Sequence, residues 1–233
     1  MGAIATLKKP SASGGPAVDS DYAVARKRMV REQIHARGIH DEAVLNAMLR
    51  LPRHRFVDPA MAPMAYSDRS IHIGESQTLS QPFIVARMLQ NLRLLKSHRV
   101  LEVGTGSGYL TALLAELVTQ VYSVERLPNL LFRARQVLKG LHYRNIVLRL
   151  GDGSKGWPVH APFDAIIVSA GSPKIPEPYF EQLAEGGRMI LPIGDEQRQE
   201  LTLVEKQGGK KHLTRLSECR FVKLKGEHGF SSS

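Results

Sequence analysis

The stretch "RVLEVGTGSGYLTALLAELV", residues 99–118, constrains the fold more than any other part of the chain. A short apolar run leads directly into three closely spaced glycines, and a longer apolar run follows them. Glycine permits a tight turn and lets a ligand approach the backbone closely, because it carries no side chain. The pattern predicts a buried strand, a turn that faces a ligand, and a helix that begins at that ligand.

Apolar runs of similar length recur after this stretch, and helix-like segments separate them. We expect helices at 127–141 and 176–185, and strands at 99–103, 120–125, 145–150, 163–170 and 187–194. Two further strands, 200–206 and 213–225, are expected to pair around "QGGKK". Strands that alternate with helices predict an α/β fold with a doubly wound, mainly parallel sheet.

The N-terminal part predicts a helical cap on this sheet. Helices are expected at 22–37, at 41–50 with Asp41 as N-cap, and from Pro82 to near Leu95. Ala, Gly, Pro and Ser make up 12 of the first 20 residues, which predicts a disordered tail over 1–20. Residues 21–233 are then expected to form a single domain. No apolar run approaches the roughly 20 residues that cross a bilayer.

Three acidic residues are expected to lie near the glycine turn in the folded chain. Glu102 precedes its first glycine by two residues, and Glu125 ends the next strand, 21 residues beyond Gly104. That second spacing places a carboxylate where it can accept both ribose hydroxyls of a nucleoside. Asp152 ends the third strand and either accepts a hydrogen bond from an adenine amino group or forms an Asp-Gly turn. Without a ligand, the glycines would make only a tight strand–helix connection.

The spacing of the glycines separates two cofactors. The dinucleotide fingerprint G-x-G-x-x-G requires a third glycine at position 109, where this chain has Tyr109. An acid just before the glycines also suits a cofactor with an ammonium group, which S-adenosylmethionine has and NAD lacks. The sequence therefore favours S-adenosylmethionine over NAD.

The motif "QTLSQP", residues 77–82, places the hydroxyls of Thr78 and Ser80 just ahead of an expected helix. A nucleophilic serine needs a base beside it, and no nearby pattern supplies one. Ser80 is therefore either the cap of the helix or a hydrogen-bond donor to a substrate.

Together the motifs resemble the protein-L-isoaspartate O-methyltransferase family. The matching segments are "YSDRSIHIGESQTLSQP", "VLEVGTGSGYLTALLA", "VYSVER", "GDGSKGW", "APFDAIIVSAG", "GGRMILPIG" and "GEHGF", in this order over about residues 25–230. The resemblance implies the class I S-adenosylmethionine-dependent methyltransferase (Rossmann-like) fold. It also implies methylation of the free carboxyl of L-isoaspartyl residues in damaged proteins and peptides, which starts repair through a methyl ester and a succinimide, with S-adenosylhomocysteine as the other product.

The resemblance also implies roles for particular residues. Ser80 is the expected active-site hydroxyl, Thr78 an additional substrate contact, and no metal is expected. The expected cofactor-binding residues are Glu102, Gly104, Thr105, Gly106, Ser107, Gly108, Glu125, Arg126, Asp152, Gly153 and Gln199. The family usually has glycine where Ser76 stands and often proline where His72 stands, so this chain departs from the pattern just before Gln77.

Charge and cysteine content bear on partners and compartment. The net charge is +10, and the basic residues are scattered with few aromatics among them, which indicates a solvated surface rather than a specific nucleic-acid site. The single cysteine, Cys219, excludes an internal disulfide and fits a reducing cytoplasm. We expect a monomer that acts on isoaspartyl proteins and peptides, without a membrane.

Two other functions are weaker. Base methylation at an amino group usually uses an Asn/Asp-Pro-Pro-aromatic loop after the fourth strand, where this chain reads "SAGSP". Methylation at carbon 5 needs a catalytic cysteine, and Cys219 lies in a late strand. A cofactor-binding module without catalysis is the other alternative, and the intact glycine loop and Ser80 argue against it.

Overall fold

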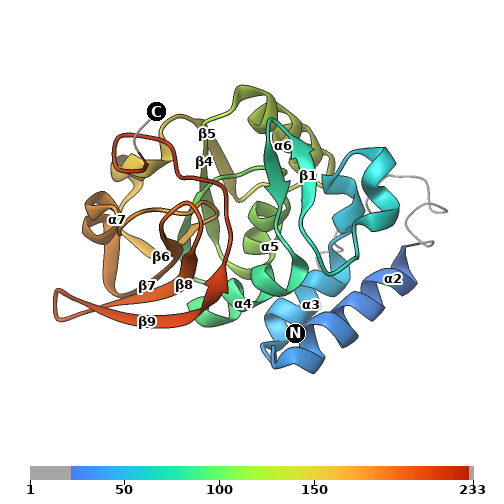
Figure 1. Ribbon diagram of the computed structural model, residues 1–233, viewed down its shortest axis with the longest axis horizontal. Coiled ribbons are helices and arrows are strands. Elements are labelled where there is room, and N and C mark those ends of the chain that lie inside the picture. The colour runs from blue at the N-terminus through green and yellow to red at the C-terminus, as the bar shows by residue number, and fades with distance from the viewer. Residues whose placement is uncertain (1–21, 231–233) are drawn as a thin grey trace, which may run out of the picture.

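The computed structural model describes residues 22–230, so the tail expected over 1–20 lies outside the described residues. Its centre is a seven-stranded sheet in the order β5-β4-β3-β6-β7-β8-β9 (Figure 1). The strands are β3 (Arg99–Val103), β4 (Gln120–Glu125), β5 (Ile146–Leu150), β6 (Phe163–Val168), β7 (Leu183–Gly194), β8 (Gln199–Gln207) and β9 (Lys210–Cys219). The first five strands in this order pair in parallel, whereas β8 pairs antiparallel with both β7 and β9. The mainly parallel sheet and the pairing of the last two strands were predicted from the sequence.

Helices cover both faces of the sheet. The α-helices are α2 (Ala23–Arg28), α3 (Glu42–Arg50), α4 (Pro82–Leu92), α5 (Tyr109–Leu117), α6 (Pro128–Gly140) and α7 (Glu177–Gln182). A π-helical turn, η1 (Met29–Ile34), and five 3-10 turns, η2 (His35–Arg37), η3 (Arg53–Phe56), η4 (Pro59–Met64), η5 (Gly153–Lys155) and η6 (Pro158–His160), complete the helical part. Among residues 22–230, none of the helices has both the length and the apolar character needed to span a membrane.

The apolar side chains of the central strands alternate between two buried clusters. Ala165 and Ile167 of β6 face the cluster that contains α4, α5, α6 and the N-terminal helices. Ile166 and Val168 face the other cluster, to which α7 contributes Tyr179. Because successive side chains of a strand point to opposite faces, a strand buried on both faces is apolar throughout. This explains the continuous apolar runs from which the sheet was predicted.

Several element boundaries differ from the expected ones. The helix expected at 176–185 ends at Gln182, because Leu183 is already extended and pairs with Phe163 of β6. Helix α4 ends at Leu92, because Arg93 adopts a left-handed φ of 48°. The last strand was expected to reach 225 but ends at Cys219, after which the chain leaves the sheet. The N-cap at Asp41 is confirmed, since its carboxylate accepts hydrogen bonds from two backbone amides of α3.

A small hairpin was not predicted from the sequence. Strands β1 (Ile71–Gly74) and β2 (Gln77–Leu79) pair antiparallel and are joined by the two residues Glu75 and Ser76. Both joining residues have positive φ, 52° and 53°, as a type I′ turn requires. The turn therefore keeps its left-handed shape although a serine occupies the second position.

We expect Ser76→Gly to raise the melting temperature by about 1–4 °C. A side chain in the left-handed region destabilises the folded state by roughly 1–2 kcal/mol, and glycine removes that cost. Glycine also makes the unfolded chain more flexible, which offsets about 0.5–1 kcal/mol of the gain. Thermal unfolding measures the gain, at about 2–4 °C per kcal/mol for a chain of this size. The control is Ser76→Ala, which keeps the β-carbon and should give no gain. An equal rise in both variants would mean that φ at position 76 carries no strain.

Candidate active site

The glycine turn lies where the direction of strand addition reverses. From β3 the chain builds β4 and β5 on one side and then crosses to β6 on the other. The end of β3 is hydrogen-bonded to both neighbouring strands. Gly104 N donates to Val124 O at 2.9 Å, and Ser169 N donates to Val103 O at 2.9 Å. Such a switch point opens a crevice at the carboxyl ends of the strands, where ligands of this fold class bind.

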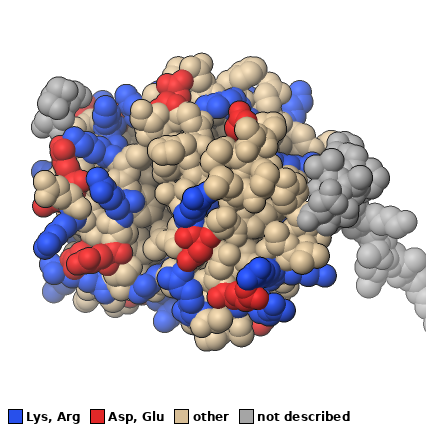
Figure 2. Space-filling model, turned by 45° about the vertical axis from the view of Figure 1, so that its right-hand side comes forward, with Lys and Arg blue, Asp and Glu red and all other residues tan. Residues whose placement is uncertain are grey.

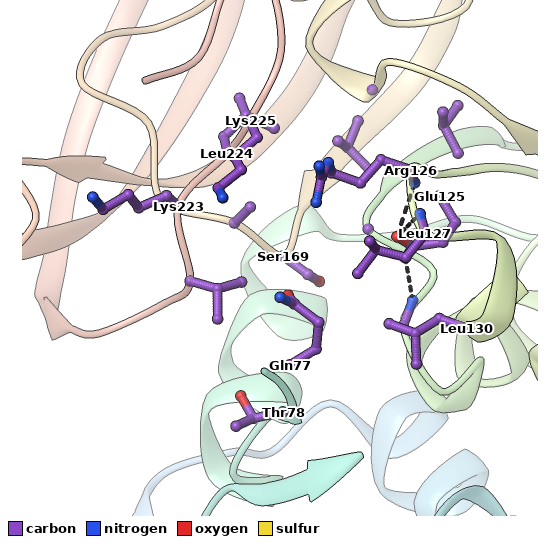
Figure 3. A pocket seen from close by; sticks show the side chains of 17 residues that line it. Gln77, Thr78, Glu125, Arg126, Leu127, Leu130, Ser169, Lys223, Leu224 and Lys225 are labelled. Carbon is purple, nitrogen blue, oxygen red and sulfur yellow. Dashed lines mark hydrogen bonds between the residues drawn. The ribbon is translucent and has the colours of Figure 1, made fainter. Parts of the chain in front are cut away.

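Glu125 closes the glycine turn from the end of β4. Its carboxylate accepts hydrogen bonds from the backbone amides of Gly106 at 2.8 Å, Arg126 at 2.8 Å and Leu127 at 3.0 Å. The carboxylate also lines the cleft in Figure 3. A carboxylate has about four acceptor positions, so one remains for a hydroxyl group of a ligand.

The cleft has about 610 Å³ of empty space, including the part open to solvent. Gly104, Gly106, Glu125, Arg126 and Gly153 line it. The C-terminal segment Lys223–Lys225 forms the opposite wall, and Figure 3 shows the Arg126 side chain reaching toward it. Sequence reasoning missed this wall, because nothing in a basic stretch near the end of the chain indicates contact with a site about 100 residues away.

Asp152 anchors that C-terminal wall. One carboxylate oxygen accepts from the amide and hydroxyl of Ser154, and the other accepts from the backbone amide of Glu227 at 2.9 Å. Burial acts to raise the pKa of Asp152, but these hydrogen bonds and Lys155 outweigh it and hold the pKa below its ordinary value. The ion pair between Lys155 and Glu227, at 2.5 Å, joins the same segments. Asp152 itself does not line the cleft, whereas its neighbour Gly153 does.

Glu102 lies beneath the glycine turn rather than in the cleft. Its side chain is fully buried, and one oxygen accepts from Thr111 Oγ1 at 2.5 Å and from Ser123 Oγ at 2.6 Å. Its other oxygen has no hydrogen-bond partner among the described residues. Burial raises the pKa of Glu102 to about 8, so the group is largely protonated at neutral pH.

Three other predicted residues of the glycine turn also lie outside the cleft. The Thr105 hydroxyl is buried 2.6 Å from that of Ser123 and extends the hydrogen-bond network of Glu102. Ser107 faces a separate cavity on the far side of the β1–β2 hairpin. Gly108 allows close packing of α5 on α6, since a β-carbon there would lie 3.2 Å from that of Ala134.

Gln199 holds the C-terminal segment in place from outside the cleft. Its side-chain oxygen accepts from Phe221 N at 2.8 Å, and its side-chain nitrogen donates to Phe221 O at 3.2 Å. The amide thus pairs with the backbone as a neighbouring strand would, two residues beyond the end of β9. This pairing turns the chain toward the cleft wall at Lys223–Lys225.

A second cavity, with about 750 Å³ of empty space including the part open to solvent, adjoins the cleft and is lined by Ser80. Thr78, Ser169 and Val222 line both spaces, so they form the wall between them. The N-cap of α4 is Gln81, and within residues 22–230 the Ser80 hydroxyl has no recorded hydrogen bond to that helix. This geometry disfavours the helix-cap interpretation of Ser80.

The position of Ser80 depends on a buried cation that sequence reasoning missed. Arg53 is fully buried and donates to the carbonyl oxygens of Ser80 and Ala65, each at 2.7 Å. Its guanidinium also lies over the Tyr109 ring, 4.7 Å from the centroid. Burial lowers the pKa of Arg53 from its ordinary value. In the sequence, "LPRHRF" resembles an exposed basic loop, which hides this role.

The cleft fits a nucleoside cofactor. The carboxylate of Glu125 stands where ribose hydroxyls need an acceptor, and Gly104 and Gly106 leave the backbone open to close approach. The doubly wound sheet and this cleft at its switch point define the chain as a class I S-adenosylmethionine-dependent methyltransferase.

Comparisons with known proteins then give the family. The family model for protein-L-isoaspartate(D-aspartate) O-methyltransferase matches residues 24–229. The chain is 54% identical over 211 residues to protein-L-isoaspartate O-methyltransferase 1 of Syntrophobacter fumaroxidans, which covers 90% of this chain and 98% of that protein. The chain belongs to the protein-L-isoaspartate O-methyltransferase family.

Solved structures agree with the assignment. A protein-L-isoaspartate O-methyltransferase structure matches with a TM-score of 0.79 and 31% identity, over 88% of this chain and 67% of that one. A candidate protein-L-isoaspartate O-methyltransferase from Plasmodium falciparum, in complex with S-adenosyl-L-homocysteine, matches with a TM-score of 0.74 and 28% identity, over 86% and 98%.

We expect Glu125→Ala to weaken binding of S-adenosylmethionine. Loss of hydrogen bonds to a charged acceptor costs about 1.5–3 kcal/mol, which corresponds to roughly 10- to 150-fold in the dissociation constant. Calorimetric titration measures the constant. Glu185→Ala removes an exposed acid outside the cleft and serves as the control. An unchanged constant for Glu125→Ala would remove this residue from the cofactor site.

We expect Glu102→Gln to flatten the dependence of stability on pH. The pKa of Glu102 is raised on folding to about 8, so its contribution to stability is complete below about pH 4.5 and is lost as the pH rises toward 8. Relative to the variant, the wild-type free energy of unfolding should fall by up to about 1.4 kcal/mol per pH unit between pH 5 and 8. Denaturant unfolding at several pH values gives both curves, and parallel curves would contradict a raised pKa.

Proposed function

We propose that the protein transfers a methyl group to the free carboxyl of L-isoaspartyl residues in damaged proteins and peptides. The observation that carries the proposal is the pair of adjoining spaces that share Thr78, Ser169 and Val222 as a common wall. One space suits a nucleoside cofactor, and the other contains the Ser80 hydroxyl. Such an arrangement lets the methyl donor and the methyl acceptor meet at the shared wall while each is bound by its own set of residues.

The cofactor is S-adenosylmethionine, which when bound supplies an electrophilic methyl group on a sulfonium centre. Glu125 accepts a hydrogen bond from a ribose hydroxyl, and the backbone of Gly104 and Gly106 lies against the cofactor. Gly153 and Arg126 flank the adenine end. Glu102, Thr105, Gly108 and Gln199 act indirectly, because they fix the glycine turn and the C-terminal wall rather than line the cleft.

The acceptor needs no general base. A free α-carboxyl has a pKa near 3.5, so it is already ionised at pH 7. The task of the protein is to align the carboxylate and to exclude water, and positioning of this kind supplies roughly 7–11 kcal/mol. A neutral hydroxyl suits this task better than a cation, because a cation would bind the carboxylate too tightly for its oxygen to react.

Ser80 donates one hydrogen bond to the acceptor carboxylate and Thr78 donates another. The methyl ester that forms next to a backbone amide closes to a succinimide with loss of methanol, by ordinary chemistry. Hydrolysis of the succinimide returns part of the material to normal aspartate, so the enzyme starts the repair and takes no part in its later steps.

The same proposal covers the organisation of the molecule. Residues 21–233 work as a single methyltransferase domain, and a monomer is sufficient, since the residues assigned to both spaces come from one chain. The substrates are isoaspartyl proteins and peptides rather than nucleic acid, and the free thiol of Cys219 fits work in a reducing cytoplasm.

Turnover on paired peptides tests this function. Two peptides of the same sequence are compared, one with L-isoaspartate and the other with L-aspartate at a single position, and labelled methyl transfer is measured on each. We expect transfer to the isoaspartyl peptide alone. Equal transfer to both peptides, or to neither, would contradict the proposal.

We expect Ser80→Ala to reduce kcat while cofactor affinity and melting temperature stay unchanged. Removal of one donor aimed at a reacting group costs up to about 100- to 1000-fold, and the lower end is expected here because the carboxylate loses charge as it reacts. The control is Ser70→Ala, since Ser70 lines the same cavity without an assigned role. Full activity with a lowered melting temperature would instead make Ser80 a structural residue.

A further inference from the structure

Basic residues are scattered along this chain, but one segment contains them without any acidic residue. Residues 126–151 contain six of the lysines and arginines and no aspartate or glutamate, so they carry six of the ten net positive charges. The six cations are Arg126, Arg133, Arg135, Lys139, Arg144 and Arg149, and His142 lies among them. On the face drawn in Figure 2, basic and acidic side chains lie close together.

This acid-free segment folds into one unit at an edge of the sheet. It forms α6 and then β5, which is the terminal strand of the sheet and pairs only with β4. Figure 1 shows both elements together, far from β9. A groove with about 1010 Å³ of empty space, including the part open to solvent, lies along them, and Arg135, Lys139, His142 and Arg144 are among the residues that line it.

The cations of this groove have no acidic partner within residues 22–230. Arg135, Lys139 and Arg144 are exposed and form no ion pair among these residues, whereas exposed residues elsewhere in the same range do form ion pairs. Their positive field is therefore not neutralised locally, and an anionic ligand would encounter all of them together.

The floor of the groove and its edge are suited to a polypeptide. Leu138 and Val147 are among the apolar residues of the groove, and Val147 is 39% exposed. Leu150, at the end of β5, is 50% exposed. An edge strand also presents unpaired backbone donors and acceptors, on which an extended peptide can add as a further strand. A nucleic acid would use the cations but not the free strand edge.

We propose that the groove between α6 and β5 is a docking site for extended, acidic polypeptide segments that carry apolar side chains at alternate positions. Its cations bind the acidic side chains, its floor takes the apolar ones, and the edge of β5 pairs with the backbone. The inference rests on the proposed function, because such segments would belong to the damaged proteins that the enzyme methylates.

The location of the groove is compatible with simultaneous catalysis. The cavity of Ser80 is lined by residues that follow β9, at the opposite margin of the sheet from β5. A segment held on β5 therefore leaves the acceptor cavity open. We expect docking to raise the affinity for long acidic substrates without changing turnover of short neutral ones.

The test measures binding without methyl transfer, so it is independent of the outcome for the proposed function. A labelled peptide of alternating Glu and Val is titrated with the full-length enzyme, and fluorescence anisotropy is recorded at low and at physiological salt. Matched probes are a Glu-Ser peptide, a Lys-Val peptide and a single-stranded uridine oligonucleotide. We expect the Glu-Val peptide to bind most tightly, with an affinity that falls as salt increases.

Two variants with the same change in net charge locate the site. Arg135→Ala/Arg144→Ala removes two groove cations and should weaken binding of the Glu-Val peptide by about five- to tenfold. Lys174→Ala/Lys210→Ala removes two exposed lysines elsewhere and should weaken it less than twofold. Melting temperatures and turnover of a short neutral isoaspartyl peptide confirm that each variant is folded.

Three outcomes would overturn the proposal. The Glu-Val peptide fails to bind, or both double variants weaken it equally, or the oligonucleotide binds at the groove more tightly than the peptide. The last outcome would assign the groove to a nucleic acid. A Glu-Ser peptide that binds as well as the Glu-Val peptide would remove the apolar floor from the site, and the proposed class of segment would be wrong.

Discussion

The hydrogen bond from the Gly106 amide to the Glu125 carboxylate joins the two strand ends on which the site depends. It links the turn after β3 to the end of β4, at the point where the sheet begins to grow in the other direction. Without an acceptor there, the turn would leave a backbone donor exposed to the cleft, and its left-handed glycines would have little to hold them. In the proposed function the same carboxylate accepts a hydrogen bond from the ribose, so one group would both shape the cleft and recognise its ligand.

Much of the fold follows from local sequence, because its central strands are buried on both faces and so are apolar throughout. The strands at 99–103 and 120–125 were predicted at the bounds that the structure shows. The β1–β2 hairpin was missed because its strands are short and its turn carries Glu75 and Ser76 instead of the usual Asn-Gly. Its left-handed turn is imposed by contacts from α6, where Arg133 donates to Ile73 O and Asn129 to Glu75, and these partners are remote in sequence.

The candidate site divides in the same way. Gly104, Gly106 and Glu125 could be predicted as cleft residues from the sequence. Their spacing is set by the lengths of one helix and one strand, which are local features. The partner of Asp152 could not be predicted, because it is the backbone amide of Glu227, 75 residues away. An Asp-Gly turn after a strand gives no sign that its carboxylate will hold the end of the chain against the cleft. Hydrogen bonds between residues so far apart in the chain leave no local sequence pattern. The wall of the cleft at Lys223–Lys225 could not be predicted for the same reason.

Two fully buried ionisable residues, Arg53 and Glu102, show how the protein holds its site in position. Arg53 and Glu102 line neither cavity, yet Arg53 holds the backbone of Ser80 and Glu102 anchors the network beneath the glycine turn. A reaction that needed a proton acceptor would place a titratable group in contact with the acceptor site, with its pKa tuned toward neutrality. Here the group with the pKa of about 8 is sealed away from the substrate. Both buried ionisable residues thus hold the backbone and side chains of the site in position, as expected for a nucleophile that arrives already ionised.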